Sequence, residues 1–275
     1  MGYSVDTLER GFCFVHKLKN MCARSQAVPR SHDVDRGLAM DTIVGHETTE
    51  GGRSSQGGDA LMDELIEREW AMFSTVNEGH EKVACQERPR TFDQMRRAQF
   101  ESWSAEALES YLNDLRAAEQ EGRNLVTEKY LHMMRATEPE NYERLGQVAP
   151  TPSPRASQLV DELTCAMVRD TDELAESYPY LSVFIRPATS AGDSSVDTSF
   201  ETYTRGELMT YSERTLEALA RHQRELAAQG RSMTREAFQN TLRYQGFSSL
   251  DEAEEEARRQ VQTLGGNEAC PDCAE

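Results

Sequence analysis

The stretch SWSAEALESYLNDLRAAEQEGRNLVTEKYLHMMR, residues 102–135, decides the fold, because a second stretch of the chain repeats its pattern. The second stretch is TYSERTLEALARHQRELAAQGRSMTREAFQNTLR, residues 210–243. Each contains a serine suited to cap a helix, leucines three or four positions apart, and a glycine–arginine pair that ends the run. We therefore expect two amphipathic helices joined by a short turn in each stretch.

The two stretches align without a gap at a constant offset of 108 positions. The matches include a helix cap, Ser104 with Ser212, and a turn glycine, Gly122 with Gly230. Trp103 lies opposite Tyr211, and further identities are Phe92 and Phe200, Arg97 and Arg205, Leu108 and Leu216, Glu109 and Glu217, Arg123 and Arg231, Glu128 and Glu236, and Arg135 and Arg243. Upstream, MDEL at 62–65 resembles VDEL at 160–163, where the offset is 98.

Amphipathic helices can align by coincidence, because they share the spacing of their apolar residues. Helix caps and turn glycines that match at one constant offset favour a duplication instead. The sequence therefore predicts an all-α fold, in which two diverged repeats of a multi-helix unit pack as one helical domain about a pseudo-twofold axis. A cleft where the halves meet is the expected place for a binding site.

The helical pattern runs from residue 61 to residue 264. Its halves are expected at about 61–147 and 157–264, and a proline-rich linker at 148–156 joins them. YLSVFI at 180–185 is the one strand candidate, and a lone short strand would have no partner.

Both ends of the chain differ in composition from the helical domain. Residues 1–60 hold no sustained helical periodicity, and we expect them to be disordered or to be a misassigned extension. Met1, Met40 and Met62 are the alternative starts. Residues 265–275 are expected to form a flexible tail.

The chain is acidic, with a formal net charge of −18 and no basic stripe. Such a surface repels phosphate backbones and anionic membranes, which argues against nucleic-acid and membrane partners. No apolar run approaches the roughly 18–20 residues that span a bilayer, and the first residues lack a signal-peptide pattern. We expect a cytoplasmic location with reduced cysteines. The predominance of arginine over lysine favours a GC-rich bacterial source.

Two stretches, ELIEREWAMFSTVNEG at 64–79 and TSFETYTRGELMTYSERTLEAL at 198–219, resemble the bacterial family called domain of unknown function 4125. The resemblance covers about residues 61–260. It implies a bacterial cytoplasmic protein and specifies neither a reaction nor a cofactor. Family members are sometimes joined to a nucleotidyltransferase-like domain, for which this chain has no room. GHEKVACQ at 79–86 departs from the glycines and arginine expected there, which weakens the case for an anion-binding loop.

Cys85 is the candidate nucleophile, in a loop beside Gln86. A reactive thiol needs a base or a cation nearby to lower its pKa, and His80, Lys82 or Arg88 could supply it. No partner carboxylate or amide can be assigned from the sequence. The alternative is an inert cysteine, so the question whether the protein is an enzyme stays open.

Two patterns resemble metal sites but lack essential ligands. CPDC at 270–273 is half of a zinc site, which only Cys13 and His16 could complete, and a solvated dithiol is the alternative. Glu128 and His132 are four positions apart, whereas di-iron bundles use Glu-x-x-His pairs on two helices. No metal site is predicted.

The candidate ligand-binding residues are Arg97, Arg205, Glu207 and Tyr211. Arg97 and Arg205 hold equivalent positions, and two converging guanidinium groups could bind a carboxylate or phosphate. The expected ligand is a small anion or zwitterion. Alternatively, each arginine pairs with nearby glutamates and keeps the halves in register.

Two functional hypotheses are retained. The first is a small-molecule enzyme or binding protein whose site lies in the cleft, with loops 77–90 and 179–198 as lids. The second is a helical interaction module without catalytic activity. Two long irregular loops at corresponding places favour the first, since loops carry most binding and catalytic residues.

Overall fold

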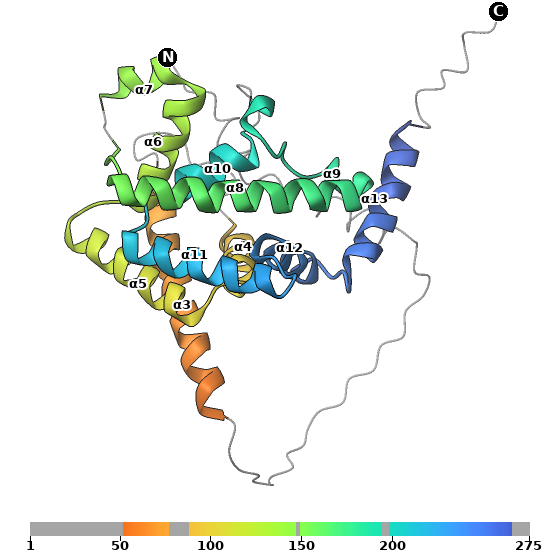
Figure 1. Ribbon diagram of the computed structural model, residues 1–275, viewed down its shortest axis with the longest axis horizontal. Helices are drawn as coiled ribbons and strands as arrows, with labels where there is room; N and C mark the ends of the chain where they lie inside the picture. The colour runs from red at the N-terminus through yellow and green to blue at the C-terminus, as the bar shows by residue number, and fades with distance from the viewer. Residues whose placement is uncertain (1–51, 77–87, 147–148, 194–197, 266–275) are drawn as a thin grey trace, which may run out of the picture.

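The computed structural model describes residues 52–76, 88–146, 149–193 and 198–265, and all regular structure in these ranges is helical (Figure 1). The all-α prediction is confirmed for this part of the chain. The first half contains α3 (Gly52–Thr75), α4 (Pro89–Phe100), α5 (Ala105–Gln120), α6 (Leu125–Thr137) and α7 (Pro139–Leu145). The second contains α8 (Pro154–Ser177), α9 (Pro179–Ser182), the 3₁₀ turn η2 (Ser190–Gly192), α10 (Phe200–Leu208), α11 (Glu213–Ala228), α12 (Met233–Tyr244) and α13 (Leu250–Gly265). None of these helices is long and apolar enough to cross a membrane.

The capping residues of α5 and α11 act as the sequence predicts. The hydroxyls of Ser104 and Ser212 each accept a hydrogen bond from the backbone N–H three residues later. Both helices are followed by a glycine with a left-handed backbone, φ 68° at Gly122 and 67° at Gly230. In both places the next N–H bonds back to a carbonyl in the last turn of the helix. The two helices therefore end in the same kind of turn, which favours glycine because L side chains rarely adopt it.

Two segments that were expected to be non-helical begin helices at a proline. α8 begins at Pro154, inside the predicted linker 148–156, after the N-cap Ser153. α9 begins at Pro179, so YLSVFI forms a helical turn and bends rather than a strand. Proline suits the first helical position, because its missing N–H would have no partner there and its φ is already helical.

α3 begins at Gly52, well before residue 61, where the sequence predicts order to start. Gly58 and Asp59 are exposed, and Figure 1 shows this end of α3 extending away from the other helices. These turns therefore continue the helix by backbone hydrogen bonds without core packing. The predictions for residues 1–51 and 266–275 lie outside the described residues.

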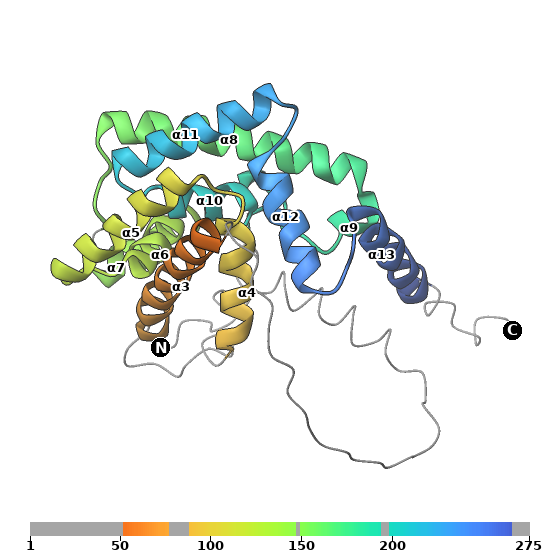
Figure 2. The same cartoon turned by 90° about the horizontal axis from the view of Figure 1, so that it is seen from below.

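The helices pack reciprocally between the two halves. α5 packs against α11, while α3 covers α5 and α8 covers α11 (Figure 2). α4 packs on α12 of the second half, and α10 packs on α6 of the first half. Each half therefore supplies a short helix to the other.

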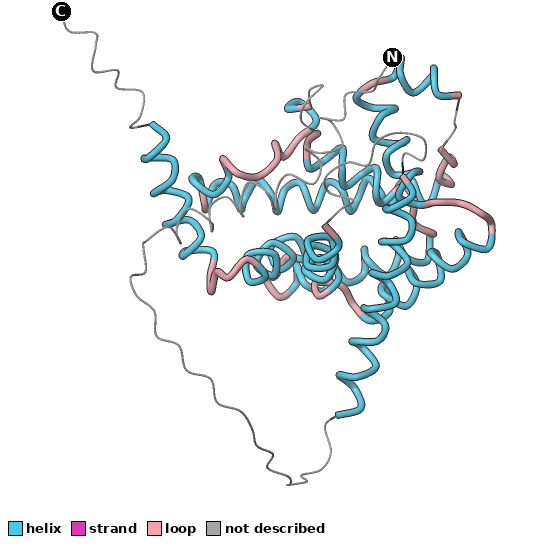
Figure 3. Tube along the Cα trace, turned by 180° about the vertical axis from the view of Figure 1, so that it is seen from behind, coloured by secondary structure: helices cyan, strands magenta, loops and turns pink. Residues whose placement is uncertain are grey.

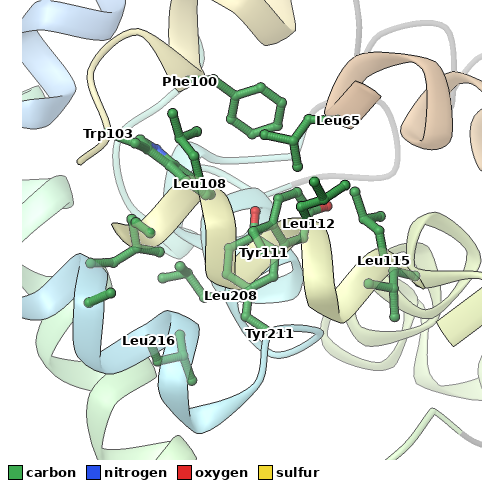
Figure 4. Close-up of a cluster of buried hydrophobic side chains, with 14 of the residues drawn as sticks. Leu65, Phe100, Trp103, Leu108, Tyr111, Leu112, Leu115, Leu208, Tyr211 and Leu216 are labelled. Carbon is green, nitrogen blue, oxygen red and sulfur yellow. The ribbon is translucent and has the colours of Figure 1, made fainter. Parts of the chain in front are cut away.

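The main hydrophobic core surrounds the contact of α5 with α11 (Figure 4). Leu65, Phe100 and Leu216 have no exposed surface, and burial of each such side chain stabilises the fold by about 1.5–3 kcal/mol. The rings of Tyr111 and Tyr211 lie in this core with their centroids 4.6 Å apart. Their hydroxyl groups need hydrogen-bond partners inside the protein.

A second hydrophobic cluster joins the end of α8 to α9, α12 and α13, at the far end of the molecule (Figure 3). Its buried residues are Leu174, Leu181, Leu242, Phe247, Leu250, Ala253 and Ala257. The carboxylate of Glu254 on α13 accepts the backbone N–H groups of Tyr180 and Leu181 at 3.0 and 2.8 Å. These bonds fix α9, and α9 positions the segment that follows it beside the cavity described below.

Candidate functional site

Four charged side chains from four helices meet inside the protein. Glu69 comes from α3, Arg96 from α4, Lys129 from α6 and Glu207 from α10. Their exposed fractions are 3%, 8%, 8% and 6%. Such residues are almost never this buried unless they are paired. We call these four residues the ion cluster.

Arg96 connects both carboxylates of the ion cluster. Its Nη2 donates to Glu69 Oε1 at 2.6 Å, and its Nε donates to the other oxygen of the same carboxylate. This bidentate geometry is the strong form of an arginine–carboxylate pair. Its Nη1 donates to Gln99 Oε1 at 2.8 Å and to Glu207 Oε1 at 3.1 Å. One guanidinium group from the first half thus holds a carboxylate from the second.

Glu207 accepts hydrogen bonds on both of its oxygens. Lys129 Nζ donates to Oε2. Gln99 Nε2 and the Tyr211 hydroxyl donate to Oε1 at 2.9 and 2.7 Å. On the other side of the cluster, the Tyr111 hydroxyl donates to Glu69 Oε1. All four charged groups are therefore paired, which is the condition under which a protein interior tolerates charge.

Burial and pairing act in opposite directions on the two carboxyl groups. Burial alone would raise the pKa of Glu207, but Lys129 and Arg96 outweigh it and hold that pKa far below its ordinary range. Burial raises the pKa of Glu69, against the opposing effect of Arg96. Burial also raises the pKa of Tyr111 and of Tyr211, so both phenols remain hydrogen-bond donors at neutral pH. With both carboxylates ionised, the ion cluster carries no net charge.

A cavity of about 220 Å³ lies against the Glu207 side of the ion cluster. Arg96, Gln99, Glu207 and Tyr211 form its polar end. The rest of the wall is mainly apolar and comes from both halves, with Trp103, Met167, Phe200, Leu219, Met233 and Phe238 among its residues. A mainly apolar space with a few convergent polar groups is the usual form of a small-molecule site.

Thr234 is an unsatisfied polar group in the wall of this cavity. Its side-chain hydroxyl is buried and has no hydrogen-bond partner, and the residue is 9% exposed. Buried hydroxyls normally have a partner, and an unpaired one costs about 1–3 kcal/mol. Thr234 lines the cavity but its oxygen is shielded, and a change between the two rotamers that threonine favours in a helix would turn the hydroxyl toward a ligand there.

Arg186 stands at the cavity on the segment that follows α9. Its Nη1 donates to the carbonyl oxygen of Thr198 at 2.6 Å, and its Cζ lies 4.8 Å from the ring centroid of Tyr203. Lys129 Nζ lies 3.6 Å from the same centroid. Two cations thus contact the Tyr203 ring, which links the cavity wall to the ion cluster through cation–π attraction.

A second, smaller cavity of about 30 Å³ lies on the other side of the ion cluster. All four residues of the ion cluster line it, together with Tyr111. Its volume is enough for a water molecule but not for an organic ligand.

Glu207 and Tyr211, two of the predicted ligand-binding residues, line the larger cavity. Arg97 and Arg205 are outside its lining. Each of them pairs with a carboxylate on its own helix and another on the long helix before it. The partners are Asp93 and Asp63 for Arg97, and Glu201 and Asp161 for Arg205.

The other candidate residues lie either outside the described residues or outside the lining of the cavity. Cys85, His80 and Lys82 lie outside the described residues, as do the cysteines and the histidine of the possible zinc site. Within the described ranges, no group of three or more His, Cys, Asp or Glu side chains is placed to hold a metal ion. Glu128 pairs with Arg123, and both ring nitrogens of His132 are buried without a partner.

Sequence reasoning missed most of the ion cluster. The best available signal was Arg96, which lies four residues after Phe92 and four before Phe100 and so shares their buried helix face. Arg97 was singled out because it matches Arg205, but one step along a helix turns a side chain about 100° away from that face. Glu69 and Lys129 carried no comparable signal.

The fold and this site define an all-α protein with a cavity beside a buried, fully paired ion cluster. The chain belongs to the family described as protein of unknown function DUF4125, whose family model matches residues 59–255. The resemblance noted in the sequence is thereby confirmed. Comparison with curated proteins and with solved structures gives no match.

Proposed function

We propose that the protein binds a small molecule in the 220 Å³ cavity, as a binding protein or as an enzyme. The cavity itself carries this proposal. Mainly apolar cavities with a few convergent polar groups are few in a protein and are the usual sites of small-molecule binding. A cavity of about 150 Å³ holds one benzene, so this one suits a ligand of roughly ten non-hydrogen atoms.

The polar end of the cavity supports the same proposal. Glu207 and Tyr211 are held in place by the ion cluster, so their positions are set before a ligand arrives. Preorganised polar groups cost little to order when a ligand binds. The unpaired hydroxyl of Thr234 is an additional contact that a ligand would satisfy after a change of the side-chain rotamer.

We infer that the domain arose by duplication and that its halves pack about a pseudo-twofold axis. α5 and α11 have the same length, 16 residues, and the same type of cap and terminal turn. Arg123 Nε donates to Glu128 at 2.8 Å, and Arg231 Nε donates to Glu236 at 2.7 Å, at the offset of 108 positions. The outer pairs of Arg97 and Arg205 support the inference in the same way. The cavity then lies where the two repeats meet.

The alternative of a helical interaction module has less support. On the described surface, the exposed large hydrophobic residues are Tyr180 and Val183. An interface normally shows a contiguous apolar patch of several hundred Å². Two neighbouring side chains do not make such a patch.

A cavity-filling variant tests the proposal directly. Ala237 lines the cavity, so Ala237→Leu should abolish thermal stabilisation by a ligand from a metabolite panel and raise the melting temperature of the free protein. Met167→Phe, at another part of the wall, is a second filler. Ala227→Leu makes the same change on the exposed face of α11 and should leave binding unchanged. Binding that survives both fillers would place the ligand elsewhere.

A further inference from the structure

The two cavities occupy matching places in the two halves. We call two residues counterparts when they are 108 positions apart, or 98 positions apart between α3 and α8, as in the sequence matches. Every residue that lines the smaller cavity has a counterpart that lines the larger one. Phe92 and Phe200 are one such pair, and Leu125 and Met233 are another. The match includes residues that each cavity receives from the other half. Glu207 lines the smaller cavity, and its counterpart Gln99 lines the larger one.

The cavities differ where the first half carries its buried polar side chains. Glu69, Arg96, Lys129 and Tyr111 have the counterparts Met167, Thr204, Ala237 and Leu219. Three charges and a phenol are thus replaced by uncharged and mostly apolar side chains. In the first half the polar groups fill the space and leave about 30 Å³, whereas in the second half about 220 Å³ stays open.

We propose that the larger cavity binds an uncharged, mainly apolar molecule with one hydrogen-bonding group, which takes the space that the buried polar side chains occupy in the first half. This proposal rests on the small-molecule function proposed above and names the class of its ligand. The hydrogen-bonding group pairs with the hydroxyl of Thr234 once a change of rotamer has turned that hydroxyl into the cavity. The counterpart of Thr234 in the smaller cavity is the apolar Val126.

The charge balance of the cavity argues against an ionic ligand. The charged groups at its polar end are Arg96 and Glu207, and each is already paired within the ion cluster. Arg186 is bound to the Thr198 carbonyl and stacks on Tyr203. A cationic ligand would lose its hydration without gaining an available carboxylate, and an anionic ligand would have to compete with the contacts that already hold the Arg186 guanidinium.

Four ligands built on one benzene ring test the proposal. Benzyl alcohol, toluene, benzoate and benzylammonium are similar in size and differ in charge and hydrogen bonding. Affinities for the full chain are measured by calorimetric titration at one pH and salt concentration. We expect benzyl alcohol to bind roughly five-fold more tightly than toluene, as one neutral hydrogen bond predicts. Each ion should bind about ten-fold or more weakly than benzyl alcohol, because it must be desolvated.

Thr234→Val gives the cavity the residue of its counterpart and removes only the hydroxyl. In this variant benzyl alcohol should lose its advantage over toluene, while the affinity for toluene stays the same or rises. Thr234→Ser keeps a hydroxyl and should retain the preference. Toluene binding serves as the internal control for folding, because a misfolded variant would lose both ligands.

The outcomes separate the ligand class from the function. If benzoate or benzylammonium binds as tightly as benzyl alcohol, and Ala237→Leu blocks that binding, the cavity is a site but the uncharged class is wrong. An unchanged preference for benzyl alcohol in Thr234→Val also overturns the assignment of the hydrogen bond. If no member of the set and no metabolite binds, the proposed function fails and the ligand class fails with it.

Discussion

Gln99 and Glu207 occupy equivalent positions in the two halves, and a hydrogen bond of 2.9 Å joins Gln99 Nε2 to Glu207 Oε1. Direct contact between equivalent residues is what a twofold axis produces along its length. The pair therefore lies where the proposed pseudo-twofold axis would pass. One half supplies an amide at this point and the other a carboxylate. The positive charges of Arg96 and Lys129 balance the negative charges of Glu207 and Glu69.

Removing the second partner of the Lys129–Glu207 pair should destabilise the protein less than removing the first did. Glu207→Gln leaves Lys129 buried without a carboxylate, and Lys129→Met leaves Glu207 with one cation fewer. We expect each single variant to lose about 3–5 kcal/mol of unfolding free energy, and the double variant to lose less than the sum. Urea unfolding of the four proteins checks this. Additive losses would show that the two groups are not coupled.

Neighbouring arginines should differ in their effects. Arg96→Met breaks the buried pairs and should cost about 3 kcal/mol or more. Arg97→Met removes partly exposed pairs and should cost about 1 kcal/mol or less. Chemical denaturation provides both values.

Arg205→Ala tests the site predicted from the sequence. If the ligand binds in the cavity, the ligand should stabilise this variant as much as it stabilises the natural chain.

Gly206 on α10 packs directly against α6. A Cβ atom at this position would be 2.8 Å from Met133 Cγ and 3.1 Å from the carbonyl oxygen of Lys129. We expect Gly206→Ala to destabilise the protein by about 1–3 kcal/mol, because α10 must move away from the residue that binds Glu207. Gly58→Ala is the matched control, since nothing lies within 4 Å of its Cβ and the helix should gain about 0.5–1 kcal/mol. Equal effects would contradict the close approach.

His132 should make stability depend on pH. Burial lowers the pKa of His132 below its ordinary value of 6.5, and Arg135 lowers it further while Glu128 opposes the shift. The unfolded chain therefore takes up a proton more readily, so this contribution to stability is present above pH 6.5 and is lost as the pH falls below it. Thermal melts at pH 7.5 and 5.5 should show a smaller decrease for His132→Leu than for the natural chain. The same decrease in both proteins would assign the pH dependence to other groups.

The fold could be predicted largely because its signals are local. Ser104, Ser212 and the two turn glycines determine helix ends through contacts within one turn, and the sequence shows such contacts directly. The starts at Pro154 and Pro179 were missed because proline favours both extended spacers and first helical positions. Neighbouring residues alone do not decide between the two.

The site was harder to predict because its residues meet only after folding. Glu69 and Glu207 are far apart in the chain and share Arg96, and nothing in the sequence records that contact. The repeat led to Glu207 and Tyr211, which line the cavity, and also to Arg97 and Arg205, which pair at its outside. Matching positions identify repeated surface pairs as readily as a binding site. Differences between matched positions of the two halves, such as Lys129 and Ala237, mark the cavity better than identities do.

The exchange of short helices has a consequence for cooperativity. α4 packs on α12, and α10 packs on α6, so the two halves cannot separate without breaking the packing of these helices. The two halves therefore form one cooperative unit, and the segment that joins them does not act as a hinge between independent domains. The described helices of both halves should melt in a single transition, and a split protein should regain its fold only when both fragments are present. Under the proposed duplication, this mutual packing would let one half change its buried side chains while the other half preserved the fold.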